Sequence, residues 1–182
     1  MKKTKILPVV VLIVLIMLVI SSVAYAMPAT AAQNFGARLS GAEEVPPRDT
    51  DATGVAFFQL NEAGTAISFT VTVSNIENVF AAHIHCGAKG VNGPVGVTLF
   101  TGPVGGGAIS GALAKGTITA PDSGNGCGWA DLAAVVAAMN SGNTYVNVHT
   151  NDGVAPTNTG PGDFPGGEIR GQVTIVPPVK SK

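Results

Sequence analysis

The sequence predicts a mainly β protein, an antiparallel Greek-key β-sandwich with one short helix near residues 131–140. Short apolar runs separated by turn residues support this fold class, since the 182-residue chain contains 24 glycines and 12 prolines. Apolar and polar residues also alternate strictly over 67–74, which is typical of a strand with one buried face. Repeated strands of this kind form sandwiches, and an eight-stranded barrel is the alternative.

Residues 1–26 have the three parts of a secretory signal peptide. Three lysines lie within residues 1–5, an apolar run follows over 6–20, and an A-x-A cleavage site ends at Ala26. A second such site ends at Ala31. The apolar run is shorter than the ~20 residues that cross a bilayer, which favours a cleaved signal peptide. The alternative is that residues 1–26 are not cleaved and remain as an N-terminal anchor. In both cases we expect the rest of the chain to be secreted or held at the cell surface.

The remaining elements are expected in the following order. Residues 27–36 form a short leading segment, and the domain spans 37–176. The one helix, 131–140, places Leu132, Val135 and Met139 on one apolar face, with Asp131 positioned to cap its first turn. Residues 177–182 form a disordered tail. Strands are expected at 54–60, 65–74, 79–86, 95–100, 115–120, 144–150 and 168–176.

The composition excludes several classes of protein. Hydrophobic residues make up 46% of the chain and charged residues 12%, whereas a disordered chain is poor in apolar residues and rich in charge. The formal net charge of −1 gives no basic surplus, so we expect no contact with nucleic acid. Later segments are too polar to span a bilayer, so membrane contact is expected only through residues 1–26, if they are uncleaved.

Cys86 and Cys127 are the only cysteines in the chain. Two cysteines in an exported domain are typical of a single disulfide, and we predict that these two are paired. The alternative is that Cys86, which follows two closely spaced histidines, is a metal ligand.

All three histidines fall within expected strands. His83 and His85 are two residues apart, so they project from the same face of their strand. In 144–150, His149 and Asn147 alternate with two valines and therefore share the polar face. If the strands at 79–86, 144–150 and 168–176 lie in one sheet, a single face carries His83, His85, Asn147, His149, Glu168, Arg170 and Gln172.

This polar face has two interpretations. In the first, the three histidines bind Cu or Zn, and Asn147 or Glu168 orients one of the ligating rings. In the second, the face is the solvated side of a sandwich, and Glu168 and Arg170 are a surface pair. The adjacent acids Glu43 and Glu44 precede two prolines, which favours an extended loop over a catalytic carboxylate pair.

Four segments occur in a fixed order along the chain: 39–47 (LSGAEEVPP), 82–97 (beginning AHIHCG), 142–150 (GNTYVNVHT) and 166–172 (GGEIRGQ). Together they resemble the chordin-type (CHRD) domain, and the resemblance extends over residues 37–176. The sequence departs from the usual pattern in a long insert at 152–165, between the last two segments.

The resemblance implies an extracytoplasmic domain and says little about activity. The histidine pair on 79–86 also resembles the copper strand of Cu/Zn superoxide dismutase, another Greek-key β protein. The expected sandwich is immunoglobulin-like or dismutase-like. Three histidines are too few for the two-metal site of that enzyme. We expect a non-catalytic binding or structural module that holds a transition metal through three histidines. One alternative is an interaction module that contacts an extracellular protein or glycan through the polar face or through residues 87–94 and 151–166. A second alternative is a metal-dependent redox enzyme.

Overall fold

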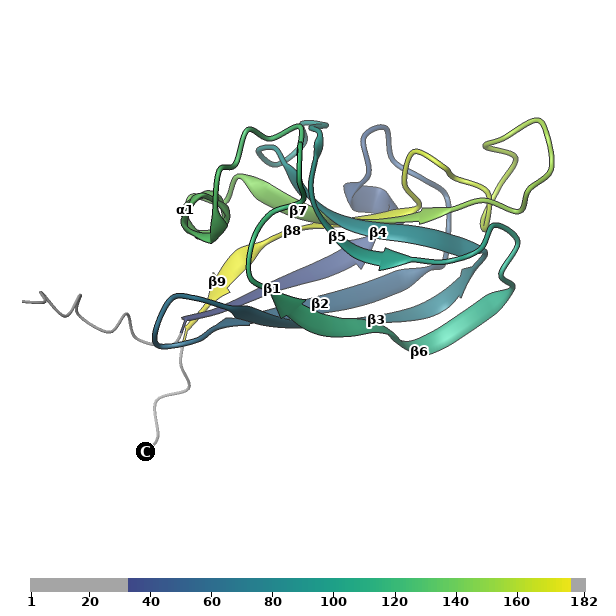
Figure 1. Cartoon of the computed structure of the whole chain (residues 1–182). Helices are drawn as coiled ribbons and strands as arrows, with labels where there is room; N and C mark the ends of the chain where they lie inside the picture. The colour runs from purple at the N-terminus through teal and green to yellow at the C-terminus, as the bar shows by residue number, and fades with distance from the viewer. Residues whose placement is uncertain (1–32, 178–182) are drawn as a thin grey trace, which may run out of the picture.

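The computed structural model describes residues 33–177, which form a nearly closed antiparallel barrel flattened into two layers (Figure 1). In chain order its elements are β1 (Gln33–Ser40), the 3-10 turn η1 (Gly41–Glu43), β2 (Thr53–Leu60), β3 (Ile67–Glu77), β4 (Val79–Cys86), β5 (Val95–Thr101), β6 (Ala108–Ile118), α1 (Leu132–Asn140), β7 (Thr144–Thr150), β8 (Ile169–Gln172) and β9 (Thr174–Val176).

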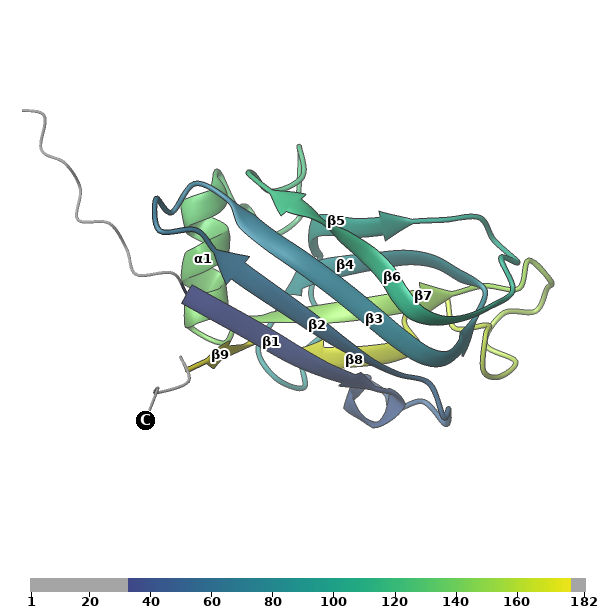
Figure 2. The same ribbon diagram turned by 90° about the horizontal axis from the view of Figure 1, so that it is seen from below.

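The strands follow one another in the order β5-β4-β7-β8-β1-β2-β3-β6, and β9 also pairs with β1. Figure 1 shows β5, β4, β7 and β8 in one layer above β1, β2, β3 and β6 in the other. In Figure 2 the lower strands cross the upper ones at an angle, and α1 lies at one end of the molecule. The sheet bends between β8 and β1. The fold therefore has two layers, like the predicted sandwich, and is nearly closed, like the alternative barrel.

The core lies between the two layers and follows the predicted alternation. On β3, Ile67, Val71 and the other apolar residues are buried, whereas the threonines and serines that alternate with them are exposed. The rings of Phe58 and Phe69 meet across β2 and β3 with centroids 6.4 Å apart. The predicted helix is confirmed, and Asp131 caps it by accepting a hydrogen bond from the Ala134 amide at 2.9 Å.

Several strands differ from the prediction. β3 spans Ile67–Glu77 instead of 65–74, and the expected strand at 168–176 is divided into β8 and β9. β1 begins at Gln33, so residues 33–36 belong to the sheet and not to a leading segment. Residues Phe35, Ala37 and Leu39 of β1 are buried, but Gly36 and Ala37 are small, so the alternation of apolar and polar residues is not evident in the sequence. β6 spans Ala108–Ile118, whereas the sequence predicts a strand at 115–120. Two register shifts interrupt its pairing with β3, and many of its residues are small, so the sequence shows no clear alternation here.

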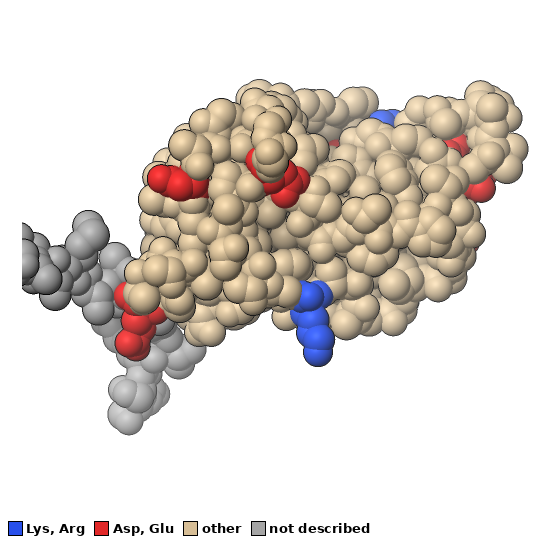
Figure 3. Space-filling model, in the orientation of Figure 1, with Lys and Arg blue, Asp and Glu red and all other residues tan. Residues whose placement is uncertain are grey.

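The predicted signal segment, residues 1–26, lies outside the described residues, as does the tail beyond residue 177. Within the described part of the chain, no helix has the length and apolarity needed to cross a membrane. Figure 3 shows one face of the molecule, on which charged side chains are few and scattered, consistent with the low charged fraction of the sequence.

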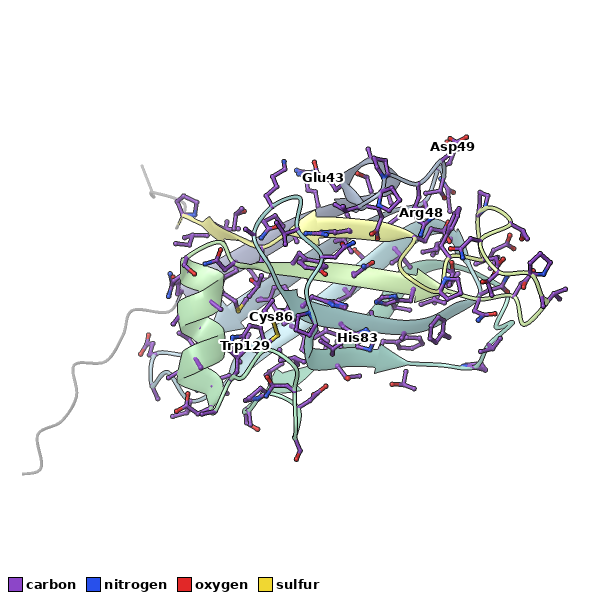
Figure 4. All side chains as sticks on the ribbon, turned by 90° about the horizontal axis from the view of Figure 1, so that it is seen from above. Glu43, Arg48, Asp49, His83, Cys86 and Trp129 are labelled. Carbon is purple, nitrogen blue, oxygen red and sulfur yellow. A yellow bond between two sulfur atoms is a disulfide. The ribbon has the colours of Figure 1, made fainter. Side chains whose placement is uncertain are left out.

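Cys86 and Cys127 form the predicted disulfide, with their Cα atoms 5.8 Å apart. The bond joins the end of β4 to the loop that precedes α1. In the same loop the Trp129 ring packs directly on the backbone of Gly96 in β5, where a Cβ atom would clash with it. Figure 4 shows Cys86 and Trp129 close together beside α1. This pairing removes Cys86 from the set of candidate metal ligands.

Replacing both Cys86 and Cys127 by serine is expected to lower the free energy of unfolding by about 3 kcal/mol, because the bond closes a long loop in the unfolded chain. Chemical denaturation of the oxidised protein and the double variant measures the difference. The reduced wild type serves as the control and should match the variant. Equal stability of the oxidised and reduced proteins would contradict the prediction.

Candidate metal centre

The three strands that carry the polar face lie side by side in the upper layer. The register places His83 of β4 opposite Asn147 of β7, and Asn147 opposite Arg170 of β8. Ile84, Val146 and the other residues that alternate with these point into the core and are fully buried. The chain thus places His83, His85, Asn147, His149, Arg170 and Gln172 on one side of one sheet, on the face away from the core, whereas the Glu168 carboxylate lies near residues of β3 and β6.

This face is not solvated, so the interpretation as a solvated surface is wrong. His85 and His149 are each 7% exposed, Asn147 is 3% exposed and Arg170 is 2% exposed, whereas His83 is half-buried. The segments 87–94 and 152–167 and the turn after β1 supply the partners of these side chains. A polar face that is enclosed by loops has the burial that a binding site needs.

His83, His85 and His149 form a compact cluster. One ring nitrogen from each lies within 4.8 Å of those of the other two. The ring centroids of His83 and His149 are 5.0 Å apart, and those of His85 and His149 are 5.6 Å apart. Two nitrogens that bind one Cu or Zn ion at about 2.0–2.1 Å are at most about 4.2 Å apart, so these three rings surround one ion after closing by a few tenths of an ångström.

Backbone carbonyls fix the orientation of two of the rings. Nδ1 of His85 lies 2.9 Å from the Gly93 carbonyl oxygen, and Nδ1 of His149 lies 3.0 Å from that of Pro165. A carbonyl only accepts, so each Nδ1 carries the proton and donates it, which leaves the lone pair on Nε2. Both Nε2 atoms, together with Nδ1 of His83, are buried and have no hydrogen-bond partner.

Burial keeps the cluster neutral, which is the form that binds a metal. Burial, together with the nearby His83 and Arg170, lowers the pKa of His85 to about 4, against the hydrogen bond to Gly93 that raises it. Burial likewise lowers the pKa of His149 to about 4. The pKa of His83 is lowered by burial as well, although the charge of Asp122 opposes this.

Aromatic side chains support the cluster from two directions. The Tyr145 ring stacks on the His85 ring with centroids 4.9 Å apart and planes 11° from parallel. The guanidinium of Arg170 lies 3.5 Å above the centre of the same Tyr145 ring. On the other side, the Phe80 ring lies 6.1 Å from that of His149. The rings are therefore held by packing as well as by hydrogen bonds.

Glu168 and Arg170 do not orient the histidines directly, which corrects the expectation for Glu168. Glu168 accepts hydrogen bonds from Thr50 and Thr150, both at 2.6 Å, and from the Gly162 amide at 2.9 Å. Arg170 donates to Asn92 Oδ1 at 2.9 Å and to the Val91 carbonyl at 2.8 Å. Both side chains instead anchor the loops that supply the Pro165 and Gly93 carbonyls.

Glu44 is a further buried group at this face that the sequence did not single out. The two adjacent acids separate at the η1 turn: Glu43 is half-buried and pairs with Lys89 at 3.3 Å, whereas Glu44 is 5% exposed. Glu44 interacts with the Asn147 amide, and a Cβ on Gly167 would lie 2.5–2.7 Å from both side chains. Nothing in the local sequence distinguishes the two acids, because the difference arises from the turn.

The buried Glu44 carboxyl predicts a pH dependence of stability. Burial raises its pKa from 4.5 to about 7, against the charges of Arg170 and Arg48. Between these values the folded chain holds a proton that the unfolded chain has lost, so stability falls as the pH rises through this window. Relative to the Glu44→Gln variant, the wild type should lose about 3 kcal/mol between about pH 4 and about pH 8.

Chemical denaturation of both proteins with a chelator present measures this difference. The histidines titrate in both proteins, so their contribution cancels in the comparison. A difference in unfolding free energy that does not change with pH would show that Glu44 is not protonated in the folded state.

Fold and site together define the class of protein: a small disulfide-linked β-barrel domain with a buried cluster of three histidines on one outer face. Comparison with known families matches residues 35–173 to the CHRD domain. The chain belongs to the CHRD domain family, as the resemblance of its four segments indicated. The match runs from β1 through the end of β8 and includes all three histidines. Neither the curated proteins nor the solved structures contain a match to the chain.

Proposed function

We propose that this CHRD domain is a non-catalytic module outside the cytoplasm that binds one transition metal ion, Cu or Zn, through His83, His85 and His149. The observation that carries the proposal is that three histidines, each with a buried, unpartnered ring nitrogen, have ligand atoms within 4.8 Å of one another. Neutral imidazole is a preferred ligand of both metals. The Nδ1–carbonyl hydrogen bonds supply the outer support that metal-ligating histidines usually have.

The unpaired nitrogens favour a metal ion over water. A buried acceptor without a partner costs about 1–3 kcal/mol, and this cluster contains three. A water molecule donates only two hydrogen bonds, so it leaves one nitrogen unpaired when Nδ1 of His83 is an acceptor like the two Nε2 atoms. A single metal ion binds all three lone pairs, so it is the occupant that satisfies the whole cluster.

Two features support a location outside the cytoplasm. The sequence of residues 1–26 has the pattern of a secretory signal. The Cys86–Cys127 disulfide persists in an oxidising compartment and is rare in a reducing one.

Isothermal titration of the purified, chelator-treated protein with Cu²⁺ and Zn²⁺ tests metal binding. We expect one ion per chain with a Kd below ~10 μM, and a loss of affinity of about 100-fold or more in His149→Ala. Thr70→Ala, an exposed position on β3 in the opposite layer, is the control and should bind as the wild type does. Binding weaker than ~10 μM for both metals, or unchanged binding in His149→Ala, would contradict the proposal.

A second function is supported by one observation. Val91 and Val154 are 53% and 63% exposed, and they lie on the two segments predicted to contact a partner, 87–94 and 151–166. Contact surfaces contain contiguous exposed apolar side chains, and these two valines identify the segments on which such a surface is to be tested. If the titration finds no metal, recognition of an extracellular protein or glycan through these segments becomes the function that the structure supports best.

A further inference from the structure

The three histidines approach a common point from one side only. His83 and His85 come from β4 and His149 comes from the neighbouring β7, and all three rise from the same face of the sheet. Among residues 33–177, no other histidine, cysteine, aspartate or glutamate joins this cluster. Zn²⁺ sites with four protein ligands are closed, whereas sites with three keep a further position for an exogenous ligand.

The surroundings of the cluster are closed around two rings and open beside the third. Tyr145 stacks on His85, and Phe80 lies beside His149, while both rings are tied to loop carbonyls. His83 is half-buried and has no such tie. Figure 4, which looks down on this face, shows His83 in view on the upper surface of β4. Access from solvent is therefore on the His83 side.

The charged groups near the opening do not fill this position. The carboxylate whose charge acts on His83 is that of Asp122. Asp122 Oδ2 accepts hydrogen bonds from the Thr98 amide at 2.9 Å and from the Thr98 hydroxyl at 2.7 Å, which hold it at β5. On the other side, Arg170 contributes positive charge near His85. A divalent ion among three neutral rings adds further positive charge, which favours an anion as its additional ligand.

We propose that a metal ion held by the three histidines keeps one coordination position open to solvent beside His83, and that this position takes water or a small anion. The inference rests on the proposed metal binding and specifies what the site can accept. It assigns to the domain a second ligand, bound through the metal and not through the loops.

Asn147 is the competing occupant of this position. Its Oδ1 atom is buried without a partner, and its residue lies opposite His83 in the register. However, its amide packs beneath Gly167 and interacts with Glu44, and an amide oxygen is a weaker ligand than imidazole for Cu or Zn. We therefore expect Asn147 to remain outside the coordination sphere.

Visible absorption of the Co²⁺-loaded protein, titrated with sodium azide, tests the inference. Co²⁺ reports its own ligands, so exchange of one ligand shifts the bands. We expect the wild type to show a shift that saturates at one azide per cobalt, and Asn147→Ser to show the same shift. Thr70→Ala is again the control for unrelated effects.

The other outcomes overturn the inference in distinguishable ways. Cobalt bands that azide leaves unchanged in both proteins mean that the position is closed, although metal binding stands. An azide shift in Asn147→Ser alone means that Asn147 fills the position in the wild type. Absence of protein-bound cobalt bands, together with no binding of Cu²⁺ or Zn²⁺ by calorimetry, contradicts the metal proposal itself.

Discussion

Replacing Glu168 by alanine is expected to lower the free energy of unfolding by about 5 kcal/mol, because the fully buried carboxylate accepts three hydrogen bonds. Its partners are the hydroxyls of Thr50 and Thr150 and the amide of Gly162, which belong to three different parts of the chain. Thr150 in turn accepts a hydrogen bond from the Phe164 amide at 3.0 Å. Loss of the carboxylate leaves the hydroxyls of Thr50 and Thr150 and the amide of Gly162 without this acceptor.

Chemical denaturation of the variant measures the loss. Glu168→Gln keeps one acceptor oxygen and should lose about half as much stability as Glu168→Ala. Asp51→Asn changes an exposed acid in the segment before β2 and should change the free energy of unfolding by less than about 0.5 kcal/mol. A loss below about 1 kcal/mol in Glu168→Ala would show that the loop does not depend on this carboxylate.

Replacing Arg170 by methionine is expected to lower the free energy of unfolding by about 4 kcal/mol and to weaken metal binding. The guanidinium is 2% exposed, stacks on Tyr145, and holds the loop 87–94 through Asn92 and the Val91 carbonyl. That loop supplies the Gly93 carbonyl that orients His85. Methionine keeps the apolar stem of the side chain but donates no hydrogen bond.

Denaturation and metal titration of the same variant separate the two effects. We expect a loss of about 10-fold or more in metal affinity, as for other residues that orient metal ligands. Arg38→Met is the matched control, because Arg38 is exposed on β1 and points away from the histidines. If Arg170→Met binds metal with wild-type affinity, the Gly93 carbonyl does not need Arg170 for its position.

The sequence was sufficient to predict the strands that carry the ligands. The bounds 79–86 and 144–150 are confirmed, since both strands are flanked by clear turn residues. Spacing alone placed His83 and His85 on one face, and the register of β4 with β7 brings His149 to them. The disulfide followed in the same way from the cysteine count and the exported character of the chain.

The sequence was not sufficient to predict what covers this face. Thr50 and Glu168 are 118 residues apart, and their hydrogen bond depends on how the loops fold over the sheet. The same holds for Glu44, which differs from Glu43 only in its direction after η1. Local patterns report alternation within a strand, and they contain no information on loop partners that are distant in the chain.

The two carbonyl tethers have a consequence for when the metal enters. The rings of His85 and His149 are set by Gly93 and Pro165, so their ligating nitrogens are aimed before any ion is bound. The ligands lie on strands that are far apart in the sequence and meet only when the sheet has formed. The unfolded chain therefore offers no complete site, in contrast to domains that fold around their ion. For the metal binding proposed above, we expect loading to follow folding, so that the ion comes from the compartment that the finished domain occupies.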